Sequence, residues 1–519
     1  VVEAGALVHT ALMQPVDADG RVLRYSVGPT REDVIAAEQD EYDSGIRIDG
    51  DVPTSQNLFR SGLVEGRLAT QRLGFWFDRT PLLARVPDQW KSIDMGSGMR
   101  RALNGPPDDK GGDLPSGAPT PWKVAREESK GRVAILTRVG ESEGLASKPE
   151  VELWVLNASG GGRPQRCNDQ KCIGKAISDI QWRPGSDEVL FTVSDRRYGY
   201  AQSIFRWNVA SGVVVPIADS RGLMNSGERY GRPTSGCGVA RSVLVCVTAE
   251  ADRPPRLERI DIETGDKLVL FDPNLDLARH IALNAPAHLI SWEDASGEVF
   301  TGQLFPARSA SGEKPPLFVL YYHCFGFLRG GYGDEWPLAA LASNGISALC
   351  INSAPYRLDA ATRFDQGLSA VESVVDMLGS SGSIDPSRVG MGGLSFGTEV
   401  TMWTAIHSDV LKAASVTSPL VTHTMYLHGS MREEAFFSGL RMAWQLGSPS
   451  ETPKQWQRLA AELNIERIEA PILMQMPEQE YLWALDYAIP LMRRRKAELY
   501  AFPHAPPFKF QTSHLLAAN

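Results

Sequence analysis

The residues with the clearest chemical potential are the five at positions 393–397, Gly-Leu-Ser-Phe-Gly, a G-x-S-x-G pattern centred on Ser395. A short strand-like run precedes them at 388–391, and a run with apolar residues at helical spacing follows them. Glycines permit the sharp strand-to-helix turn from which a serine hydroxyl can project. The order of these elements favours a serine nucleophile over an ordinary turn made of glycine and serine.

A nucleophilic serine needs a base to take its proton and a carboxylate to orient that base. Where the serine lies on such a turn, the carboxylate and then the histidine follow it along the chain. Glu478 and Glu480 follow the apolar run 471–476, and His504 follows the last apolar run, 498–502. We expect one of the two glutamates to be the acid and His504 to be the base, although paired glutamates in a loop are also a common surface feature.

The remaining histidines are poor candidates for the base. His407, His423 and His428 precede the expected acid, which breaks the chain order, so we interpret them as structural or substrate-contacting residues. His514 lies near the end of the sequence and is interpreted as a residue at the start of a helix.

The oxyanion that forms during acyl transfer needs hydrogen-bond donors. The backbone N–H of Phe396, the residue after the candidate nucleophile, is one expected donor. The second is expected where the strand-like run 317–322 ends, because a hydroxyl of Tyr321 or Tyr322 can donate from that position. The alternative is that these two tyrosines form a buried aromatic pair.

The elements that position these residues form an α/β pattern over residues 305–519. Helical stretches, of which 361–378 has an apolar face, alternate with apolar runs at 317–322, 346–351, 413–416, 472–476 and 498–502. Buried strands that alternate with amphipathic helices indicate a mostly parallel, doubly wound sheet covered on both faces. Sites in such sheets lie at the carboxyl ends of the strands, which is where Ser395 falls.

An internal repeat precedes this domain. Residues 152–160, 204–212 and 257–265 are each a short strand-like run closed by small residues, and their closing glycines are 52 and 53 residues apart. A period near 50 residues with about four short strands is typical of a β-propeller blade. We therefore predict a β-propeller over residues 1–304, with strand-like pieces at 21–27 and 74–77 belonging to more diverged or incomplete blades.

Composition limits the classes of function. The 519 residues are 43% hydrophobic and 22% charged, as in ordinary globular proteins of two or three domains. The net charge of −9 argues against nucleic acid or an anionic membrane as a partner, and no apolar run reaches 18 residues. No cluster of His and Cys has the spacing of metal ligands, so neither a metal nor an organic cofactor is expected.

Six cysteines fall into three pairs along the chain. The spacings Cys167 to Cys172 and Cys237 to Cys246 suit two local disulfides, whereas Cys324 and Cys350 lie in or beside apolar runs and are predicted to be core thiols. Two disulfides would indicate an oxidising compartment such as the periplasm. The alternative is six reduced cysteines in a cytoplasmic protein.

A propeller followed by an α/β-hydrolase domain that carries a serine on such a strand-to-helix turn resembles the prolyl oligopeptidase family of serine peptidases. Within that family, three segments are similar to the lasso-peptide isopeptidase branch: 326–337 (Gly-Phe-Leu-Arg-Gly-Gly-Tyr-Gly-Asp-Glu-Trp-Pro), 393–399 (Gly-Leu-Ser-Phe-Gly-Thr-Glu) and 473–481 (Leu-Met-Gln-Met-Pro-Glu-Gln-Glu-Tyr). The resemblance covers most of the chain and is strongest after residue 305.

The resemblance implies roles for individual residues. It places the nucleophile at Ser395 and the oxyanion tyrosine at Tyr322. It places the acid at Glu480, three residues after Pro477, which stands where the family usually has glycine. A glutamate in the acid position fits the isopeptidase branch.

The base departs from the family pattern, in which the histidine ends a stretch similar to Phe-Pro-Asp-Glu-Pro-His. Residues 502–507 here are Phe-Pro-His-Ala-Pro-Pro, so Pro507 stands in the histidine's register and His504 comes three residues early. Three extended residues span about 10 Å, against a hydrogen-bond reach of about 3 Å. His504 can serve only if this loop takes a different course.

The resemblance implies a peptidase that cleaves the isopeptide bond of lasso peptides through an acyl-enzyme, with a compact peptide as its substrate. Two alternatives remain open from the sequence. One is a general peptidase or esterase of this family that acts on linear substrates. The other is a catalytically impaired homologue that binds peptides, because Pro507 occupies the expected register of the base.

Overall fold

The structure is a computed structural model that describes most of the chain from residue 121 onward and shorter pieces before it. The described residues are 6–8, 22–44, 59–60, 63–64, 67–68, 71–73, 79–81, 89–94, 96–103, 121–127, 131–139, 150–157, 163–224, 236–307, 312–328, 336–355, 359–430 and 433–502. Among the sequence predictions, the strand at 74–77, the base candidate His504 with Pro507, and His514 lie outside these residues.

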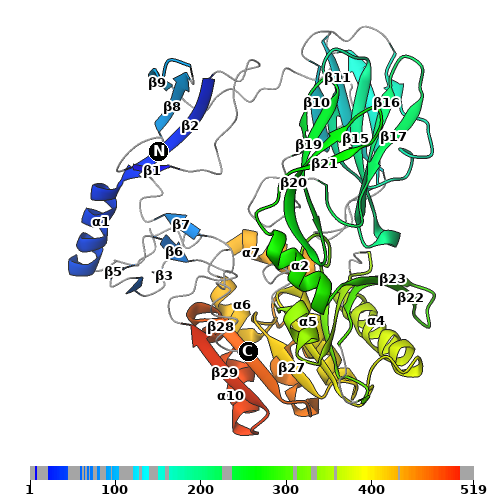
Figure 1. The fold of residues 1–519 in the computed structure, drawn as a ribbon. Helices are drawn as coiled ribbons and strands as arrows, with labels where there is room; N and C mark the ends of the chain where they lie inside the picture. Colours follow the sequence, from blue (N-terminus) through cyan, green and yellow to red (C-terminus); the bar gives the residue numbers. More distant parts are fainter. Residues whose placement is uncertain are drawn as a thin grey trace.

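Three four-stranded antiparallel sheets follow one another along the chain (Figure 1). Each is a meander in which consecutive strands are hydrogen-bonded neighbours. Their strands are β10 (Lys123–Arg126), β11 (Arg132–Arg138), β12 (Val151–Asn157) and β13 (Gln165–Arg166); β14 (Ile177–Trp182), β15 (Glu188–Asp195), β16 (Ala201–Asn208) and β17 (Val214–Asp219); and β18 (Gly238–Val239), β19 (Val243–Glu250), β20 (Arg253–Asp261) and β21 (Lys267–Phe271).

The sequence repeat corresponds to one sheet per period, because its three copies are the third strands β12, β16 and β20. The turns that close the second and third copies have the same design. Gly212 and Gly265 take φ values of 75° and 78°, which favour glycine, and each donates its N–H to the last residue of the preceding strand. The repeated small residues therefore encode the hairpin turn that leads to the fourth strand.

Buried side chains join the three sheets face to face. The first and second sheets share a core that includes Leu153 and Phe191, and the second and third share one that includes Ile204 and Leu244. Stacked four-stranded meanders are the units of a propeller. The described residues form open sheets and do not close a ring of blades, so the β-propeller over residues 1–304 stays a prediction.

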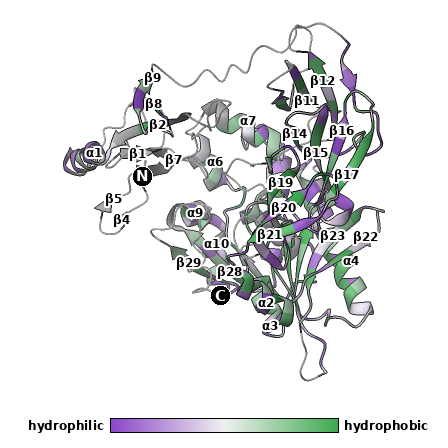
Figure 2. Ribbon diagram, turned by 45° about the horizontal axis from the view of Figure 1, so that its top comes forward, coloured by the Kyte–Doolittle hydropathy of each residue, from purple (hydrophilic) through white to green (hydrophobic). Residues whose placement is uncertain are grey.

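The N-terminal region contains a further four-stranded sheet and a helix. The strand expected at 21–27 is present as β2 (Val22–Thr30), which continues directly into α1 (Arg31–Ser44). This helix was not predicted, because its residues are largely polar (Figure 2) and show no apolar face. The other strands here are β1 (Ala6–Val8), β3 (Phe59–Arg60), β4 (Leu63–Val64), β5 (Arg67–Leu68), β6 (Gln71–Leu73), β7 (Arg79–Pro81), β8 (Gln89–Asp94) and β9 (Arg100–Leu103).

The C-terminal part is an eight-stranded sheet in the order β22-β23-β25-β24-β26-β27-β28-β29. From β25 onward all neighbours in this order are parallel, and the hairpin β22–β23 joins antiparallel at one edge. The strands are β22 (His288–Glu293), β23 (Val299–Phe305), β24 (Leu317–Tyr322), β25 (Ser347–Asn352), β26 (Val389–Gly393), β27 (Ala413–Val416), β28 (Ile472–Pro477) and β29 (Ala497–Phe502). The predicted parallel α/β sheet is therefore confirmed, whereas the domain boundary at 305 stays a prediction.

Helices cover both faces of this sheet. The core on one face joins Val319 and Ile351 to Val371 of α4 and Val400 of α5, and the core on the other joins Cys350 to α3. The helices are α2 (Leu275–Asn284), α3 (Leu338–Ser343), α4 (Ala360–Ser380), α5 (Phe396–His407), α6 (His423–Ser430), α7 (Glu433–Trp444), α8 (Pro453–Leu459), α9 (Glu478–Trp483) and α10 (Leu485–Arg493), with short 3₁₀ turns η2 (Arg196–Tyr198), η3 (Ala461–Leu463) and η4 (Ile465–Arg467). None of the described helices is long and apolar enough to cross a membrane.

All six cysteines are paired. Disulfides join Cys167 to Cys172 and Cys237 to Cys246, the pairs that the spacing suggests. A third joins Cys324 to Cys350, so the prediction that these two are core thiols is wrong. Cys324 lies two residues after the end of β24 and Cys350 lies in β25, and these strands are parallel neighbours, which brings the two Cα atoms to 5.6 Å.

Direct contacts connect the antiparallel sheets to the α/β part. The Arg196 side chain donates to Glu298 at 2.7 Å, and the N–H of Leu328 donates to the carbonyl of Ala251 at 3.1 Å. These bonds join the second and third meander sheets to the edge β22–β23 and to the loop after β24.

Candidate active site

Ser395 lies on a sharp turn between β26 and α5, as the pentapeptide predicts. Its backbone has φ 53° and ψ −123°, a conformation that a non-glycine residue adopts only where the surrounding structure enforces it. Gly393 makes the turn possible, because a Cβ at this position would lie 2.0 Å from the carbonyl carbon of Gly397. The strained turn holds a partly exposed serine at the carboxyl end of a central strand.

Buried hydroxyl groups hold this turn in place. Ser418 accepts the N–H of Ser395 at 2.9 Å, and the Thr398 hydroxyl donates to the carbonyl of Gly393 at 2.6 Å. Thr417 donates its N–H to the same carbonyl at 3.1 Å. Ser418 and Thr417 directly follow β27, the parallel neighbour of β26. They could not be identified from the sequence, because the sequence does not show which strands become neighbours.

Glu480 lies in α9, directly after β28, and its side chain is fully buried. Strands β26, β27 and β28 are consecutive parallel neighbours, so the turn that bears Ser395 and the helix that bears Glu480 both lie at the carboxyl ends of the strands. Burial of a carboxylate is costly unless it is hydrogen-bonded, which favours a specific task over a solvated surface charge. The surface alternative for Glu480 is therefore not supported.

The segment that contains His504 begins beside Glu480. Strand β29 pairs in parallel with β28, and Phe502, its last residue, stands opposite Pro477, the last residue of β28. The chain therefore leaves β29 at the same edge of the sheet and directly beside the start of α9. His504 itself lies outside the described residues, so its role as the base remains a prediction.

The two expected oxyanion donors follow or end adjacent strands: Phe396 comes after β26, and Tyr322 ends β24. Phe396 is the first residue of α5, where backbone N–H groups point away from the helix. Tyr322 is the last residue of β24, the parallel neighbour of β26 on the other side from β27. Both roles remain predictions. The side chain of Tyr322 lies outside the described part of the chain.

Tyr321 is excluded as an oxyanion donor. Its side chain is 3% exposed, its hydroxyl accepts the N–H of Ala354 at 3.3 Å, and its ring packs edge-on against Phe396. Burial raises the pKa of this phenol well above its ordinary value. Tyr321 is thus part of the core beneath the turn.

A carboxylate one helical turn after Ser395 forms a cluster that the sequence did not reveal. Glu399 accepts a hydrogen bond of 2.7 Å from the indole of Trp444, at the end of α7. Arg363 of α4 is 5% exposed, and its guanidinium lies 5.9 Å from the centre of the Phe396 ring. Burial raises the pKa of Glu399 to about 7, although the charge of Arg363 and the indole bond act in the opposite direction.

This pKa predicts that protein stability depends on pH. Between the ordinary pKa of 4.5 and about 7, the folded protein binds a proton at Glu399 that the unfolded chain has lost, so stability falls as pH rises through this window. Glu399→Gln keeps an acceptor for Trp444 and should raise stability at pH 8 by about 1–3 kcal/mol. Thermal unfolding of both proteins at pH 5 and pH 8 measures the difference.

Glu372→Gln is the matched control, because Glu372 is an exposed glutamate of α4 that also accepts one hydrogen bond, from Ser408. It should leave the pH slope of the unfolding midpoint unchanged. Equal pH slopes for the wild type and Glu399→Gln would contradict the interpretation.

Two of the three histidines that were set aside as candidates for the base because they precede the expected acid have structural partners. His407 packs against the ring of Trp403 with centroids 3.9 Å apart, and burial lowers its pKa. His423 bonds to Glu462 and stacks on Trp456. The side chain of His428 is outside the described residues. The described residues contain no group of three or more His, Cys, Asp or Glu side chains that could hold a metal ion.

Comparison of the sequence with known proteins identifies two curated relatives. The chain is 28% identical over 467 residues to the lasso peptide isopeptidase AtxE2 of Asticcacaulis excentricus, which covers 85% of this chain and 62% of that protein. It is 24% identical over 287 residues to the uncharacterized peptidase YuxL of Bacillus subtilis, 52% of this chain and 42% of that protein. The chain thus spans less than two thirds of either relative. No protein-family model matches it.

Comparison with solved structures shows a shared fold. An AtxE2 isopeptidase variant with bound Astexin3-dC4 superposes with a TM-score of 0.72 at 22% identity, over 99% of this chain and 74% of that one. An acylaminoacyl peptidase in complex with Z-Gly-Gly-Phe-chloromethyl ketone gives a TM-score of 0.61 at 14% identity, over 99% of this chain and 79% of that one. Together with the similarity to AtxE2 in sequence, these matches confirm that the chain resembles the prolyl oligopeptidase family of serine peptidases and, within it, the lasso-peptide isopeptidase branch.

Proposed function

We propose that this protein is a serine peptidase that hydrolyses the isopeptide bond of a lasso peptide. The observation that carries the proposal is the similarity to a lasso peptide isopeptidase over 85% of the chain. The strained turn at Ser395 and the buried Glu480 at the same edge of the sheet support it independently.

In the proposed reaction, the Ser395 hydroxyl attacks the carbonyl that links an acidic side chain of the peptide to the peptide's N-terminal amine. His504 takes the hydroxyl proton as the C–O bond forms, and the N–H of Phe396 and the hydroxyl of Tyr322 stabilise the oxyanion. The intermediate collapses, the C–N bond breaks, and the departing amine takes the proton from His504. The peptide remains attached to Ser395 as an ester.

Water then completes the cycle. His504 removes a proton from a water molecule, which attacks the ester carbonyl, and the C–O bond to Ser395 breaks to release the peptide's side chain as a carboxylic acid, which then ionises in solution. The proton returns to the oxygen of Ser395. Glu480 holds the correct tautomer of His504 and stabilises the imidazolium that forms in each half of the cycle.

The antiparallel sheets complete the proposal. We place them in a β-propeller over residues 1–304 that limits access to the α/β-hydrolase domain over residues 305–519, so that the substrate is a compact peptide. Three disulfides favour the periplasm over the cytoplasm as the location, because disulfides persist in oxidising compartments.

The test compares one peptide in three forms: the threaded lasso peptide, the same sequence without the isopeptide bond, and a simple acyl ester. Mass spectrometry should show a gain of one water by the lasso peptide and no cleavage of the linear form. Hydrolysis of the linear peptide or of the ester alone would instead support a general peptidase or esterase, which the fold shared with an acylaminoacyl peptidase makes the second candidate. Binding of the lasso peptide without any turnover would identify a catalytically impaired homologue.

A further inference from the structure

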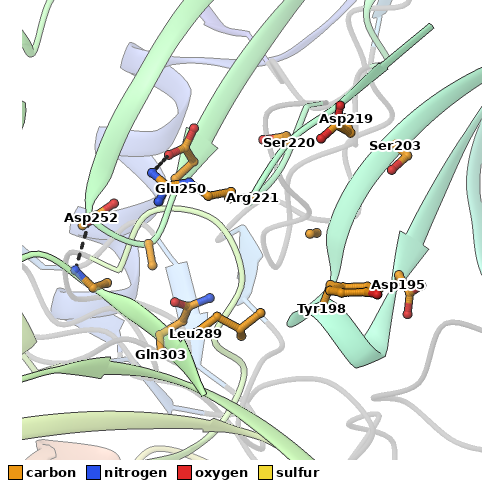
Figure 3. Close-up of a pocket in the computed structure, with 13 residues that line it drawn as sticks. Asp195, Tyr198, Ser203, Asp219, Ser220, Arg221, Glu250, Asp252, Leu289 and Gln303 are labelled. Carbon is orange, nitrogen blue, oxygen red and sulfur yellow. Dashed lines mark hydrogen bonds and ion pairs between the residues drawn. The ribbon is translucent and has the colours of Figure 1, made fainter. Parts of the chain in front are cut away.

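A cavity of about 420 Å³ lies between the antiparallel sheets and the edge of the eight-stranded sheet (Figure 3). Leu289 of β22 and Gln303 of β23 line one side, and residues near the ends of β15, β16, β17 and β19 line the other. Strands β23 and β26 are three steps apart in the sheet, about 14 Å. This cavity, here called the edge pocket, is therefore separate from the turn that bears Ser395.

The edge pocket is acidic. Asp195, Asp219, Glu250 and Asp252 line it, and Arg221 is the one cation among the described lining residues. Arg221 pairs with Glu250 at 2.8 Å; although burial acts in the opposite direction, this guanidinium and that of Arg256 hold the pKa of Glu250 below its ordinary value. Glu250 is thus already neutralised by its partners.

The other three carboxylates have no cationic partner within ion-pair distance among the described residues. Asp195 accepts the N–H of Arg197 at 2.9 Å, and Asp252 accepts the N–H of Ala287 at 3.0 Å, so each engages one oxygen with the backbone. Asp219 is exposed and lines the opposite side. Arg221 also attracts Asp252, and the Lys267 ammonium lies at the backbone carbonyl of Asp219, but four carboxylates against one lining guanidinium leave the pocket with a net negative charge that a cation would reduce.

Gln303 gives a second and independent indication of a ligand. Its side chain is 6% exposed, and its carboxamide has no hydrogen-bonding partner among the described residues. Figure 3 shows the carboxamide at the end of a side chain that points into the space below Glu250. The amide lies at the surface of the cavity, so a bound ligand that donates a hydrogen bond to its oxygen would be stabilised there.

Apolar surface lies beside these polar groups. Tyr198, Leu289, Ala251 and Ala287 all line the pocket. An aromatic ring and aliphatic side chains next to carboxylates suit a cation on a hydrocarbon stem, because the stem contacts the apolar wall while the charged head reaches the carboxylates. The volume falls within the usual range for small-molecule sites.

We propose that the edge pocket binds an organic cation, an amine or guanidinium group on an aliphatic stem. The head pairs with the carboxylate of Asp252 and donates to the amide oxygen of Gln303, and Asp219 attracts the positive charge from across the pocket. The stem lies against Leu289 and Tyr198. The cation is either a free small molecule or the basic side chain of a peptide.

Isothermal titration tests the proposal on the full chain carrying Ser395→Ala, which excludes turnover. N-butylguanidinium should bind with a dissociation constant of about 0.1–1 mM at low salt, and N-butylurea, its uncharged analogue, should not bind detectably. Acetyl-arginine amide against acetyl-citrulline amide forms the peptide arm. Selective binding in that arm assigns the site to a peptide side chain, and binding of butylguanidinium alone assigns it to a free small cation.

Two variants locate the binding. Gln303→Leu should weaken butylguanidinium binding about tenfold and Asp219→Asn about threefold, whereas Asp276→Asn, at an exposed carboxylate on α2 outside the pocket, should not change it. Asp219 is exposed, so its variant remains informative if Gln303→Leu fails to fold. Equal binding of the guanidinium and urea compounds, absence of binding in both arms, or unchanged affinity in Asp219→Asn would overturn the proposal.

Discussion

Ser395→Ala is expected to lower kcat for lasso-peptide hydrolysis by about 10⁶-fold while the protein remains folded and still binds the peptide. The loss is this large because no other group in the described site can form the ester on which the proposed reaction depends. Alanine at a φ of 53° introduces no strain that serine does not already bear. A fluorophosphonate probe should label the wild type at Ser395 and leave the variant unlabelled.

Ser381→Ala is the matched control for this prediction. Ser381 also lies at a helix end, where its hydroxyl donates to Leu378, and it precedes β26 whereas Ser395 follows that strand. Its removal should leave both turnover and labelling intact. Hydrolysis that persists in Ser395→Ala, or labelling that persists at another serine, would refute the assignment of the nucleophile.

His504→Ala is expected to reduce kcat by a similar factor of about 10⁶, and the double variant with Ser395→Ala should be no less active than either single variant. Nucleophile and base act in the same step, so once one of them is lost, substitution of the other causes no further loss of kcat. The rates of the three proteins are measured on the lasso peptide.

Pro507→His is a second test of the identity of the base, because residue 507 stands in the register of the family histidine. With His504 as the working base, Pro507→His should give no gain in rate, and it should not rescue His504→Ala. A large gain from Pro507→His alone would show that His504 is not the base and that the natural chain is catalytically impaired.

The local part of the site could be predicted from the sequence. The turn at 393–397 is encoded by its own glycines, and the hairpins of the repeat by theirs, because the conformations required are left-handed or exclude a Cβ. The parallel strands could likewise be read from their apolar runs. These features depend on residues close together in the chain.

Long-range pairing could not be predicted. The bond from Ser395 to Ser418 and the cluster of Glu399 with Trp444 depend on which strands and helices become neighbours. The hairpin β22–β23 is a further example. Its two strands could equally belong to the preceding antiparallel sheets, but β23 pairs with β25 of the eight-stranded sheet. Helix α1 was missed for a local reason, because its residues show no apolar face that would predict a helix.

The bridge between Cys324 and Cys350 has a consequence for when the protein matures. A newly made chain carries two thiols there, and the segment after β24 is then tied to β25 by the bond from the N–H of Cys324 to Asn352. Oxidation closes a loop across a sequence separation of 26 and adds about 3 kcal/mol by restricting the unfolded chain. The segment that follows the expected oxyanion tyrosine is therefore held by a hydrogen bond at first, and by a covalent bond only once the chain meets an oxidant.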